Sequence, residues 1–236
     1  MVGAVISRLG LSQTSFRTIA VDIIATHILV WATEASKANL LLSGGSTPGP
    51  IYEVLSELGL PWKDVAVGLV DERWVGENDN GSNAALIRKT LMQGKAKAAQ
   101  FIPMKTVHAS PQDGQQNVEA QYKKLISGKS LAVLGMGTDG HVCSWFPQSY
   151  GLDAAIDPVN KNVVQAITAN KSKVTGDYLE RMTLTLSALK QCRSVLLLIT
   201  GAEKREVLET AMNNQSSNLP VAHLLKLKNL TILHAA

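Results

Sequence analysis

The segment SLAVLGMGTDGH, residues 130–141, joins a short apolar run to a loop that contains three glycines and ends on a histidine. The run Leu131 to Leu134 has the length and composition of a buried strand. Glycines permit backbone conformations and close approaches that other residues do not. Ligands of open α/β sheets bind beyond the carboxyl ends of the strands, so this segment would place His141 at the ligand end of such a sheet.

The rest of the chain repeats this alternation of apolar runs and amphipathic stretches. Further strands are predicted at residues 39–42, 65–70, 163–167, 195–199 and 230–233. Helices are predicted at residues 48–58, 82–92, 111–126 and 202–212, and an earlier one at residues 19–37. The sequence shows no internal repeat and no linker rich in Pro, Gly or Ser. We therefore expect one domain, residues 1–236, with an α/β layered fold and a mostly parallel, Rossmann-like central sheet flanked by helices.

Composition argues against several classes of protein. The net charge is +4, the basic residues are scattered and only 5% of residues are aromatic, which does not favour nucleic-acid binding. The two cysteines, Cys143 and Cys192, form no CxxC or Cys/His cluster, so we expect neither a disulfide framework nor a zinc site, and a reducing, cytoplasmic location. The N-terminal residues lack a signal-peptide pattern, and the apolar runs are shorter than the ~20 residues that cross a bilayer, so no membrane partner is expected.

A second glycine-rich segment, SGGST at residues 43–47, follows the predicted strand 39–42. Pro48 suits the first position of a helix, and a preceding Ser or Thr would cap it. A helix N-terminus with a glycine-rich approach can bind an anion through its N–H groups and its dipole. The same residues also suit an ordinary turn between a strand and a helix, and from this segment alone both interpretations stay open. The segment is not a Walker loop, because GxxxxGK[ST] is missing.

Charged residues follow two other predicted strands. Asp71, Glu72 and Arg73 come after residues 65–70, and Arg73 has the planar fork that binds phosphate, while a carboxylate there could orient a catalytic group. Lys204 lies in the first turn of the helix after residues 195–199, where its charge opposes the helix dipole unless an anion is bound. The alternatives are a solvated turn for the first group and a lysine that extends to water for the second.

The loop that carries His141 has several interpretations. A lone histidine is more often structural, but either Asp139 or Asp71 could fix the tautomer of His141 through a hydrogen bond. The loop lacks the full context of a dinucleotide-binding GxGxxG, which makes that interpretation the weaker one. Cys143 could act as a nucleophile instead, although no base–thiol arrangement can be recognised from neighbouring positions.

Together these segments resemble the family that holds 6-phosphogluconolactonases and glucosamine-6-phosphate isomerases or deaminases. The matching segments follow the family order and span most of residues 40–210: SGGSTP at 43–48, DER at 71–73, SN at 82–83, LGMGTDGH at 134–141, RMTLTL at 181–186 and TGAEK at 200–204.

The lactonase branch fits better than the deaminase branch. The lactonases have DER and a Ser-x-Phe-Pro-like segment, here SWFP at residues 144–147. The deaminases have an aromatic residue in place of Arg73 and an essential glutamate after the histidine, whereas this chain has no glutamate between His141 and Glu180. The departures from the family pattern are Ser130, Cys143, Trp145 and the poorly matching residues 151–176.

The resemblance implies hydrolysis of 6-phospho-D-glucono-1,5-lactone, without metal or cofactor, by general-base activation of water. His141 would be the base and Asp71 an orienting carboxylate, so these two are the candidate catalytic residues. The candidate substrate-binding residues are Ser43, Gly44, Gly45, Ser46, Thr47, Arg73, Arg181 and Lys204 for the phosphate, with Gly137 and Asp139 in the histidine loop. The expected partner is the phosphorylated sugar lactone, and the expected state is a monomer or weak homodimer. The alternative functions are glucosamine-6-phosphate deamination and non-enzymatic phosphosugar sensing.

Overall fold

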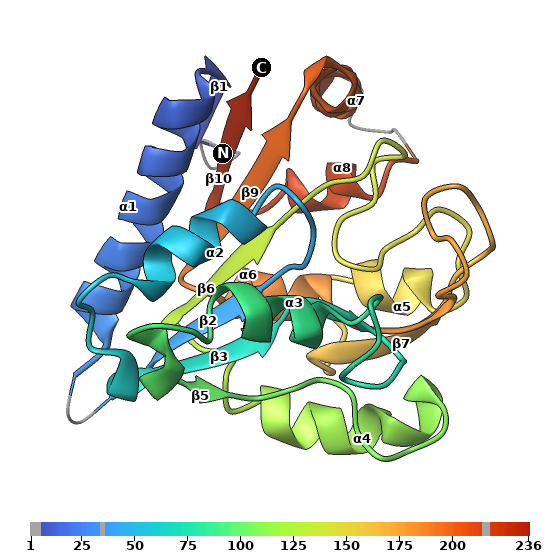
Figure 1. Cartoon of the computed structure of the whole chain (residues 1–236). Helices are drawn as coiled ribbons and strands as arrows, with labels where there is room; N and C mark the ends of the chain where they lie inside the picture. The colour runs from blue at the N-terminus through green and yellow to red at the C-terminus, as the bar shows by residue number, and fades with distance from the viewer. Residues whose placement is uncertain (1–5, 34–35, 214–217) are drawn as a thin grey trace.

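A central sheet of seven parallel strands organises the computed structural model, which describes residues 6–33, 36–213 and 218–236. In order across the sheet, its strands are β1 (Ile6–Leu11), β10 (Leu230–Ala235), β9 (Ser194–Thr200), β6 (Ser130–Leu134), β2 (Ala38–Leu42), β3 (Val65–Leu69) and β5 (Gln100–Phe101). Figure 1 shows these strands through the middle of the molecule. The α/β class and the mostly parallel sheet are thus confirmed, and β1 and β5 are edge strands that the apolar pattern did not reveal.

Helices lie around the sheet. They are α1 (Gln13–Trp31), α2 (Gly49–Ser56), α3 (Asn83–Thr90), α4 (Pro111–Tyr122), α5 (Leu152–Ile156), α6 (Leu186–Gln191), α7 (Ala202–Asn213) and α8 (Val221–Leu224), with short 3₁₀ turns at Trp62–Asp64 and Ala96–Ala98. Helix α1 contacts α2 and strands β1, β2 and β10, and it runs along the left of the sheet in Figure 1.

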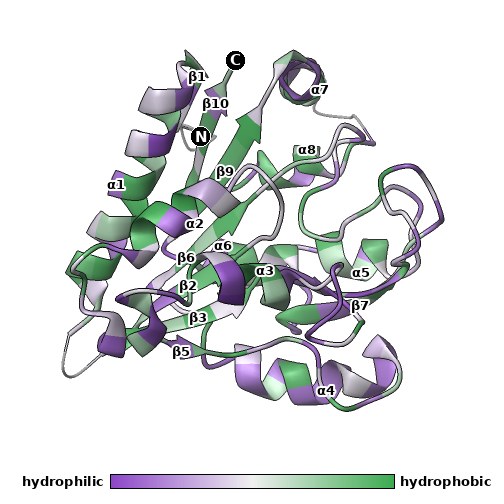
Figure 2. Ribbon diagram, in the orientation of Figure 1, coloured by the Kyte–Doolittle hydropathy of each residue, from purple (hydrophilic) through white to green (hydrophobic). Residues whose placement is uncertain are grey.

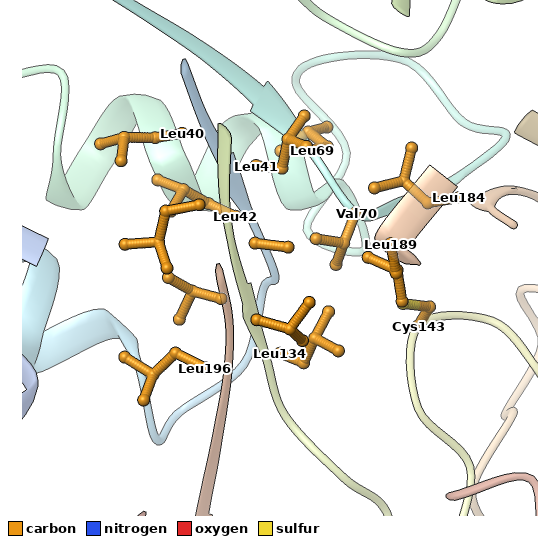
Figure 3. Close-up of a cluster of buried hydrophobic side chains, with 14 of the residues drawn as sticks. Leu40, Leu41, Leu42, Leu69, Val70, Leu134, Cys143, Leu184, Leu189 and Leu196 are labelled. Atoms are coloured by element: carbon orange, nitrogen blue, oxygen red, sulfur yellow. The ribbon is translucent and has the colours of Figure 1, made fainter. Parts of the chain in front are cut away.

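The central strands form the core. All residues of β2, β3 and β6 are buried, as expected for parallel strands that are covered on both faces. Figure 2 shows hydrophobic residues concentrated on these strands, and Figure 3 shows Leu41, Leu69 and Leu134 within one packed cluster. Such burial is favourable by about 25 cal/mol per Å² of apolar surface, which makes this sheet the rigid support of the loops at its ends.

A second, antiparallel sheet corrects two predictions. It consists of β4 (Asp71–Arg73), β8 (Glu180–Leu184) and β7 (Val164–Thr168). The apolar run 163–167 is therefore a strand, but it does not belong to the main sheet, because its backbone pairs with β8. The DER segment is likewise a strand rather than a turn, since Asp71 to Arg73 pair with residues 181–183 of β8.

Two helices differ most from their predicted bounds. Helix α1 begins after Ser12, whose hydroxyl accepts a hydrogen bond from the backbone N–H of Ser15, and it ends at Trp31 rather than at residue 37. Helix α4 ends at Tyr122 rather than at residue 126, because the chain continues in non-helical turns toward β6. Apolar periodicity alone shows neither the N-terminal cap of α1 nor the C-terminal ends of α1 and α4.

Helix α1 is long and apolar enough to cross a membrane by length and composition, with a mean hydropathy of 1.2 over 18 residues. Unbroken apolar runs do not reveal this, because Arg17, Asp22 and His27 interrupt them. In the structure Phe16, Ala20, Ile24 and Ile28 are buried on one face of α1. This face contacts β1, β2 and β10, whereas most of the helix is not buried and Leu29 and Val30 are exposed.

The order of the strands creates a switch point between β2 and β6. From β2 the chain continues outward to β3 and β5, whereas from β6 it continues in the opposite direction to β9 and β10. The two strands pair in parallel, and the backbone N–H of Ser43 donates to Val133 O at 3.0 Å just beyond β2. The loops after β2 and β6 therefore separate, and a crevice outside the carboxyl ends of such strands is where ligands of these sheets bind.

Candidate active site

A cavity of about 230 Å³ lies at this switch point. All of the predicted site residues line it except Asp139. Its lining is Ser43, Gly44, Gly45, Ser46, Thr47, Pro48, Asp71, Arg73, Asn83, Gly135, Met136, Gly137, His141, Cys143, Arg181, Leu198 and Lys204. Residues that are far apart in the sequence thus meet at one place.

Asp139 lies beside His141, which answers the question of which carboxylate orients the histidine. Its Oδ1 lies 2.6 Å from His141 Nδ1 and also accepts a hydrogen bond from the backbone N–H of His141 at 3.1 Å. Partial burial raises the pKa of Asp139, but the hydrogen bond and charge of His141 outweigh it, so the pKa of Asp139 lies below its usual range. An ionised carboxylate can only accept hydrogen bonds, so in the neutral imidazole Nδ1 carries the proton and Nε2 has the free lone pair.

Phe146 supports the imidazole from another side. The ring centroids of His141 and Phe146 are 4.4 Å apart, and the Arg181 guanidinium lies 4.9 Å from the Phe146 ring centroid. Phe146 is buried and therefore cannot move aside easily. The histidine is held both by a hydrogen bond and by an aromatic contact.

Gly137 is required for this arrangement, and its replacement gives the first prediction. A Cβ at this position would collide with the His141 ring and would lie 2.7 Å from Asp139 Oδ1. We expect Gly137→Ala to lower kcat at least tenfold, since small displacements of a catalytic group can cost about 10² in rate. The measurement is steady-state kinetics, together with Tm. Gly128→Ala is the control, because a Cβ there meets nothing within 4 Å, and equal kcat values for the two variants would contradict the assignment.

The SGGST loop presents unpaired donors to the cavity. Among the described residues, the backbone N–H groups of Gly44 to Thr47 donate to no protein acceptor, and the buried Ser43 hydroxyl has no hydrogen-bond partner. Neither Ser46 nor Thr47 caps the following helix, because α2 begins after Pro48 without a side-chain cap, which corrects that prediction. Buried polar groups such as the Ser43 hydroxyl are rarely left unpaired, and the loop N–H groups beside it are free to donate, so this loop has the properties of an anion site.

Asp71 is fixed by neighbours other than His141. Its Oδ2 accepts from Ser144 Oγ at 2.7 Å and its Oδ1 from Asn83 Nδ2 at 3.3 Å. Asn83 also lies against Gly44, where any Cβ would collide with the Asn83 side chain. The glycine, the asparagine and the carboxylate therefore form one packed unit, with Asp71 at the wall of the cavity.

Glu72, by contrast, has a structural role. It is fully buried, and its carboxylate accepts from the backbone N–H groups of Arg73, Asn83 and Ala84 and from Ser82 Oγ at 2.7–3.1 Å. A carboxylate at the N-terminus of α3 also interacts favourably with the helix dipole. Glu72 thus joins β4 to α3 and orients its two neighbours in the DER segment.

Three cationic side chains face the cavity. Arg73 and Arg181 are directly opposite each other on β4 and β8, an unfavourable pairing of like charges. Burial lowers the pKa of Arg181 to about 10, while the charge of Asp71 raises it and that of Arg73 lowers it. Arg73 Nε is buried without a partner, although Nη1 donates to Gly81 O. An anion in the cavity would supply the missing counter-charge.

Lys204 completes this cationic group from α7. The side chain is half-buried, and burial lowers its pKa below the usual lysine value, with the charge of Glu203 acting in the opposite direction. Its ammonium lies near the N-terminus of a helix, where a cation is unfavourable in the absence of an anion.

Cys143 lines the cavity but does not have the properties of a nucleophile. It is buried among apolar side chains, as Figure 3 shows for Cys143, Leu184 and Leu189. Burial and the charge of Asp71 raise the pKa of the Cys143 thiol well above its usual value. A thiol of this kind stays protonated at neutral pH and is a poor nucleophile.

Sequence reasoning missed several lining residues. Met136 and Leu198 carry no signal in the sequence, because apolar residues are common at strand ends. The SN segment at residues 82–83, quoted for the resemblance, was the one hint of Asn83. Within the described ranges, no group of three or more His, Cys, Asp and Glu side chains is placed to hold a metal ion.

Comparisons with known proteins agree with this geometry. A family model described as glucosamine-6-phosphate isomerases/6-phosphogluconolactonase matches residues 12–233. The 6-phosphogluconolactonase of Xylella fastidiosa strain 9a5c is 38% identical over 202 residues, 84% of this chain and 81% of that protein. The 6-phosphogluconolactonase of Pseudomonas aeruginosa is 35% identical over 194 residues, 82% of this chain and 79% of that protein.

Solved structures show the same fold. The crystal structure of a 6-phosphogluconolactonase from Shewanella baltica OS155 superposes with a TM-score of 0.89 at 28% identity and covers 100% of both chains. The 6-phosphogluconolactonase of Thermotoga maritima gives a TM-score of 0.81 at 27% identity over 98% of this chain and 99% of that chain. On the match of sequence, fold and site, the chain belongs to the glucosamine-6-phosphate isomerase/6-phosphogluconolactonase family.

Proposed function

We propose that this protein hydrolyses 6-phospho-D-glucono-1,5-lactone to 6-phosphogluconate in the oxidative pentose phosphate pathway. One observation carries the proposal: a histidine paired with Asp139 lines the same cavity as two arginines, a lysine and the unpartnered Ser43 hydroxyl. A base at one position and an anion site at another are what a phosphorylated lactone requires. The similarity to curated lactonases over more than four-fifths of the chain supports the same activity.

His141 acts as the general base in this proposal. Its free Nε2 takes a proton from water while the water oxygen attacks the lactone carbonyl, and the protonated ring then donates to the departing ring oxygen. Asp139 keeps Nδ1 protonated and stabilises the imidazolium that forms. The ester bond between carbonyl carbon and ring oxygen breaks, and the products are one carboxylic acid and one alcohol.

The phosphate binds to the cationic side of the cavity. Ser43 Oγ, the free N–H groups of the SGGST loop and the side chains of Arg73, Arg181 and Lys204 supply its donors. Because these groups sit on two sheets and a helix N-terminus, they fix the phosphate and thereby the distance of the lactone carbonyl from His141. Binding energy from the phosphate end then contributes to the reaction rate.

Asp71 orients the middle of the substrate. Its carboxylate lines the cavity and is held by Ser144 and Asn83, so it can accept hydrogen bonds from sugar hydroxyl groups without rearranging. Within the described part of the chain, Asp71 is the one carboxylate in the cavity lining. This argues against glucosamine-6-phosphate deamination, for which the family uses a further glutamate.

A coupled assay tests the function. Glucose-6-phosphate dehydrogenase generates the lactone, and its disappearance is followed with and without the protein, after correction for spontaneous hydrolysis. Accelerated loss of lactone is expected, whereas ammonia release from glucosamine 6-phosphate would indicate the deaminase. Binding of 6-phosphogluconate without any acceleration would instead indicate a phosphosugar sensor.

Lys204 gives a prediction with opposite effects on stability and binding. The unfolded chain holds the Lys204 proton up to a higher pH than the folded one, so the free energy of unfolding rises with pH between the two pKa values. Below that window the half-buried ammonium lowers stability, so Lys204→Met is expected to raise Tm of the ligand-free protein at pH 7. The same variant should raise KM for the phosphorylated lactone about tenfold, because it loses a charge-assisted contact.

Thermal unfolding at pH 7 and near pH 10, with and without 6-phosphogluconate, measures both effects. The gain in Tm should shrink at the higher pH. A variant that is less stable than the original protein in the absence of ligand, or that binds 6-phosphogluconate equally well, would contradict the placement of Lys204 at the anion site. Lys97→Met, at an exposed lysine outside this cavity, is the matched control.

A further inference from the structure

A second cavity, of about 810 Å³, lies away from the active site between α5, α6, α8 and the turn before β10. Its volume is within the usual range of small-molecule sites. Its lining combines an apolar floor with cationic side chains and is formed by Ile156, Pro158, Leu186, Lys190, Cys192, His223, Lys226, Leu227, Lys228 and Asn229. None of these residues lines the first cavity.

The charged side chains that line this second cavity are all lysines. Lys190, Lys226 and Lys228 are exposed at its rim, and none of the ion pairs formed among the described residues involves them. The lining contains no carboxylate. Burial and the charge of Lys226 lower the pKa of His223, so the cavity also disfavours a further positive charge. A ligand with an anionic group is therefore complementary to the rim.

The floor selects for an apolar body on that ligand. Leu186, Cys192 and Leu227 are buried, and Ile156 and Pro158 close the side next to α5. Burial raises the pKa of the Cys192 thiol to about 12, so this sulfur acts as an apolar surface rather than as a reactive group. A bare phosphate or sulfate would leave this floor unfilled.

The cavity is connected to the catalytic loop through α8. His223, on α8, lines the cavity, and the backbone N–H of Val221, at the start of the same helix, donates to Gly140 O at 3.0 Å. Leu219 also packs against Gly140, the residue directly before His141. A displacement of this four-residue helix therefore reaches the loop that holds the general base through a direct backbone contact.

We propose that the cavity between α5, α6 and α8 is a regulatory site for a small molecule with an apolar body and an anionic group, and that its occupancy is transmitted through α8 to the His141 loop. The three lysines bind the anion and the apolar floor takes the body. The site goes beyond lactone hydrolysis, and none of the three measurements below depends on that activity.

Binding is tested with 8-anilinonaphthalene-1-sulfonate, an aromatic sulfonate whose fluorescence increases in apolar surroundings. Lys226→Glu/Lys228→Glu is expected to weaken its binding to the folded protein about tenfold, since each reversal replaces an attraction by a repulsion. Lys124→Glu/Lys129→Glu is the matched control, because these two lysines line a different cavity next to β5. Equal affinities of both double variants would overturn the site.

Competition tests the ligand class. Excess inorganic sulfate, which has the charge without the body, and the neutral N-phenyl-1-naphthylamine, which has the body without the charge, should displace the probe poorly. Full displacement by sulfate at equal concentration would show that the site recognises charge alone. Full displacement by the neutral compound would show that the lysines do not contribute, and either result contradicts the proposal.

Transmission is tested by NMR of the histidine Cε1–H signals, with His141 assigned through the variant His141→Asn. The probe should shift the signals of His223 and His141 but not that of His27, which is hydrogen-bonded to Lys129 O. A shifted His223 signal with an unchanged His141 signal would overturn the coupling through α8. Loss of both shifts in Lys226→Glu/Lys228→Glu would confirm that they arise from the same site.

Discussion

Replacing His141 with asparagine is expected to lower kcat for 6-phospho-D-glucono-1,5-lactone by about 10²- to 10⁴-fold, the usual contribution of a general base. Asparagine retains a polar group of similar size but cannot take a proton from water. KM should change little, because the phosphate donors of the SGGST loop and the two arginines are untouched. The largest effect predicted for this protein therefore falls on the chemical step.

Stopped-flow or coupled measurement of lactone loss, corrected for the spontaneous reaction, determines this kcat. Binding of 6-phosphogluconate and Tm should stay close to those of the original protein, which separates a lost base from a lost fold. His108→Asn is the control, since His108 contacts Thr106 and does not line the cavity. A His141→Asn variant with kcat within a few-fold of the original would show that another group activates water.

Replacing Arg73 with methionine should lower kcat/KM for the phosphorylated lactone by about 10- to 100-fold, which corresponds to one charge-assisted interaction of about 1.5–3 kcal/mol. Unphosphorylated glucono-1,5-lactone should show almost no change, because it has no group for the guanidinium to bind. The unpartnered Nε of Arg73 and the donors of the SGGST loop are the reason to expect a phosphate here. The difference between two substrates measures the interaction directly.

Arg88→Met is the matched control, because Arg88 is exposed, pairs with Glu77 and lies outside the cavity lining. Parallel assays of both lactones with both variants complete the comparison. If Arg73→Met weakened hydrolysis of the two lactones equally, Arg73 would support the structure of the cavity rather than bind phosphate. Arg73 lies opposite Arg181, so the removal of Arg73 also relieves the repulsion between the two arginines. The comparison of the two lactones separates this structural effect from the loss of phosphate binding.

The fold was predictable to the extent that it rests on buried parallel strands. Strands β2, β3, β6 and β9 are short apolar runs, and such runs are recognisable without knowledge of their partners. The small sheet was not predictable in the same way. Strand β4 consists of three charged residues, which do not indicate a strand in the sequence. It forms a strand because it pairs with β8, which lies more than a hundred residues later in the chain.

The candidate site also contains residues that the sequence indicates and contacts that only the folded structure shows. His141 and the SGGST loop were recognisable because they follow strands directly and contain chemically distinctive residues. The sequence does not decide whether Asp71 or Asp139 contacts His141, because both aspartates follow predicted strands. The folded structure shows that Asp139 is the partner. The tie between Asn83, Gly44 and Asp71 depends on three segments that meet only in the folded chain.

The paired arginines of β4 and β8 have a consequence for the lifetime of the protein. With no anion in the cavity, two guanidinium groups face each other across one strand pair, and the hydroxyl of Ser43 is buried without a partner. A bound phosphosugar removes both penalties, and it stabilises the folded state by mass action as its concentration rises above Kd. Degradation follows the population of opened molecules. The abundance of the protein should therefore respond to the supply of its own substrate, with slower turnover when phosphosugar is plentiful.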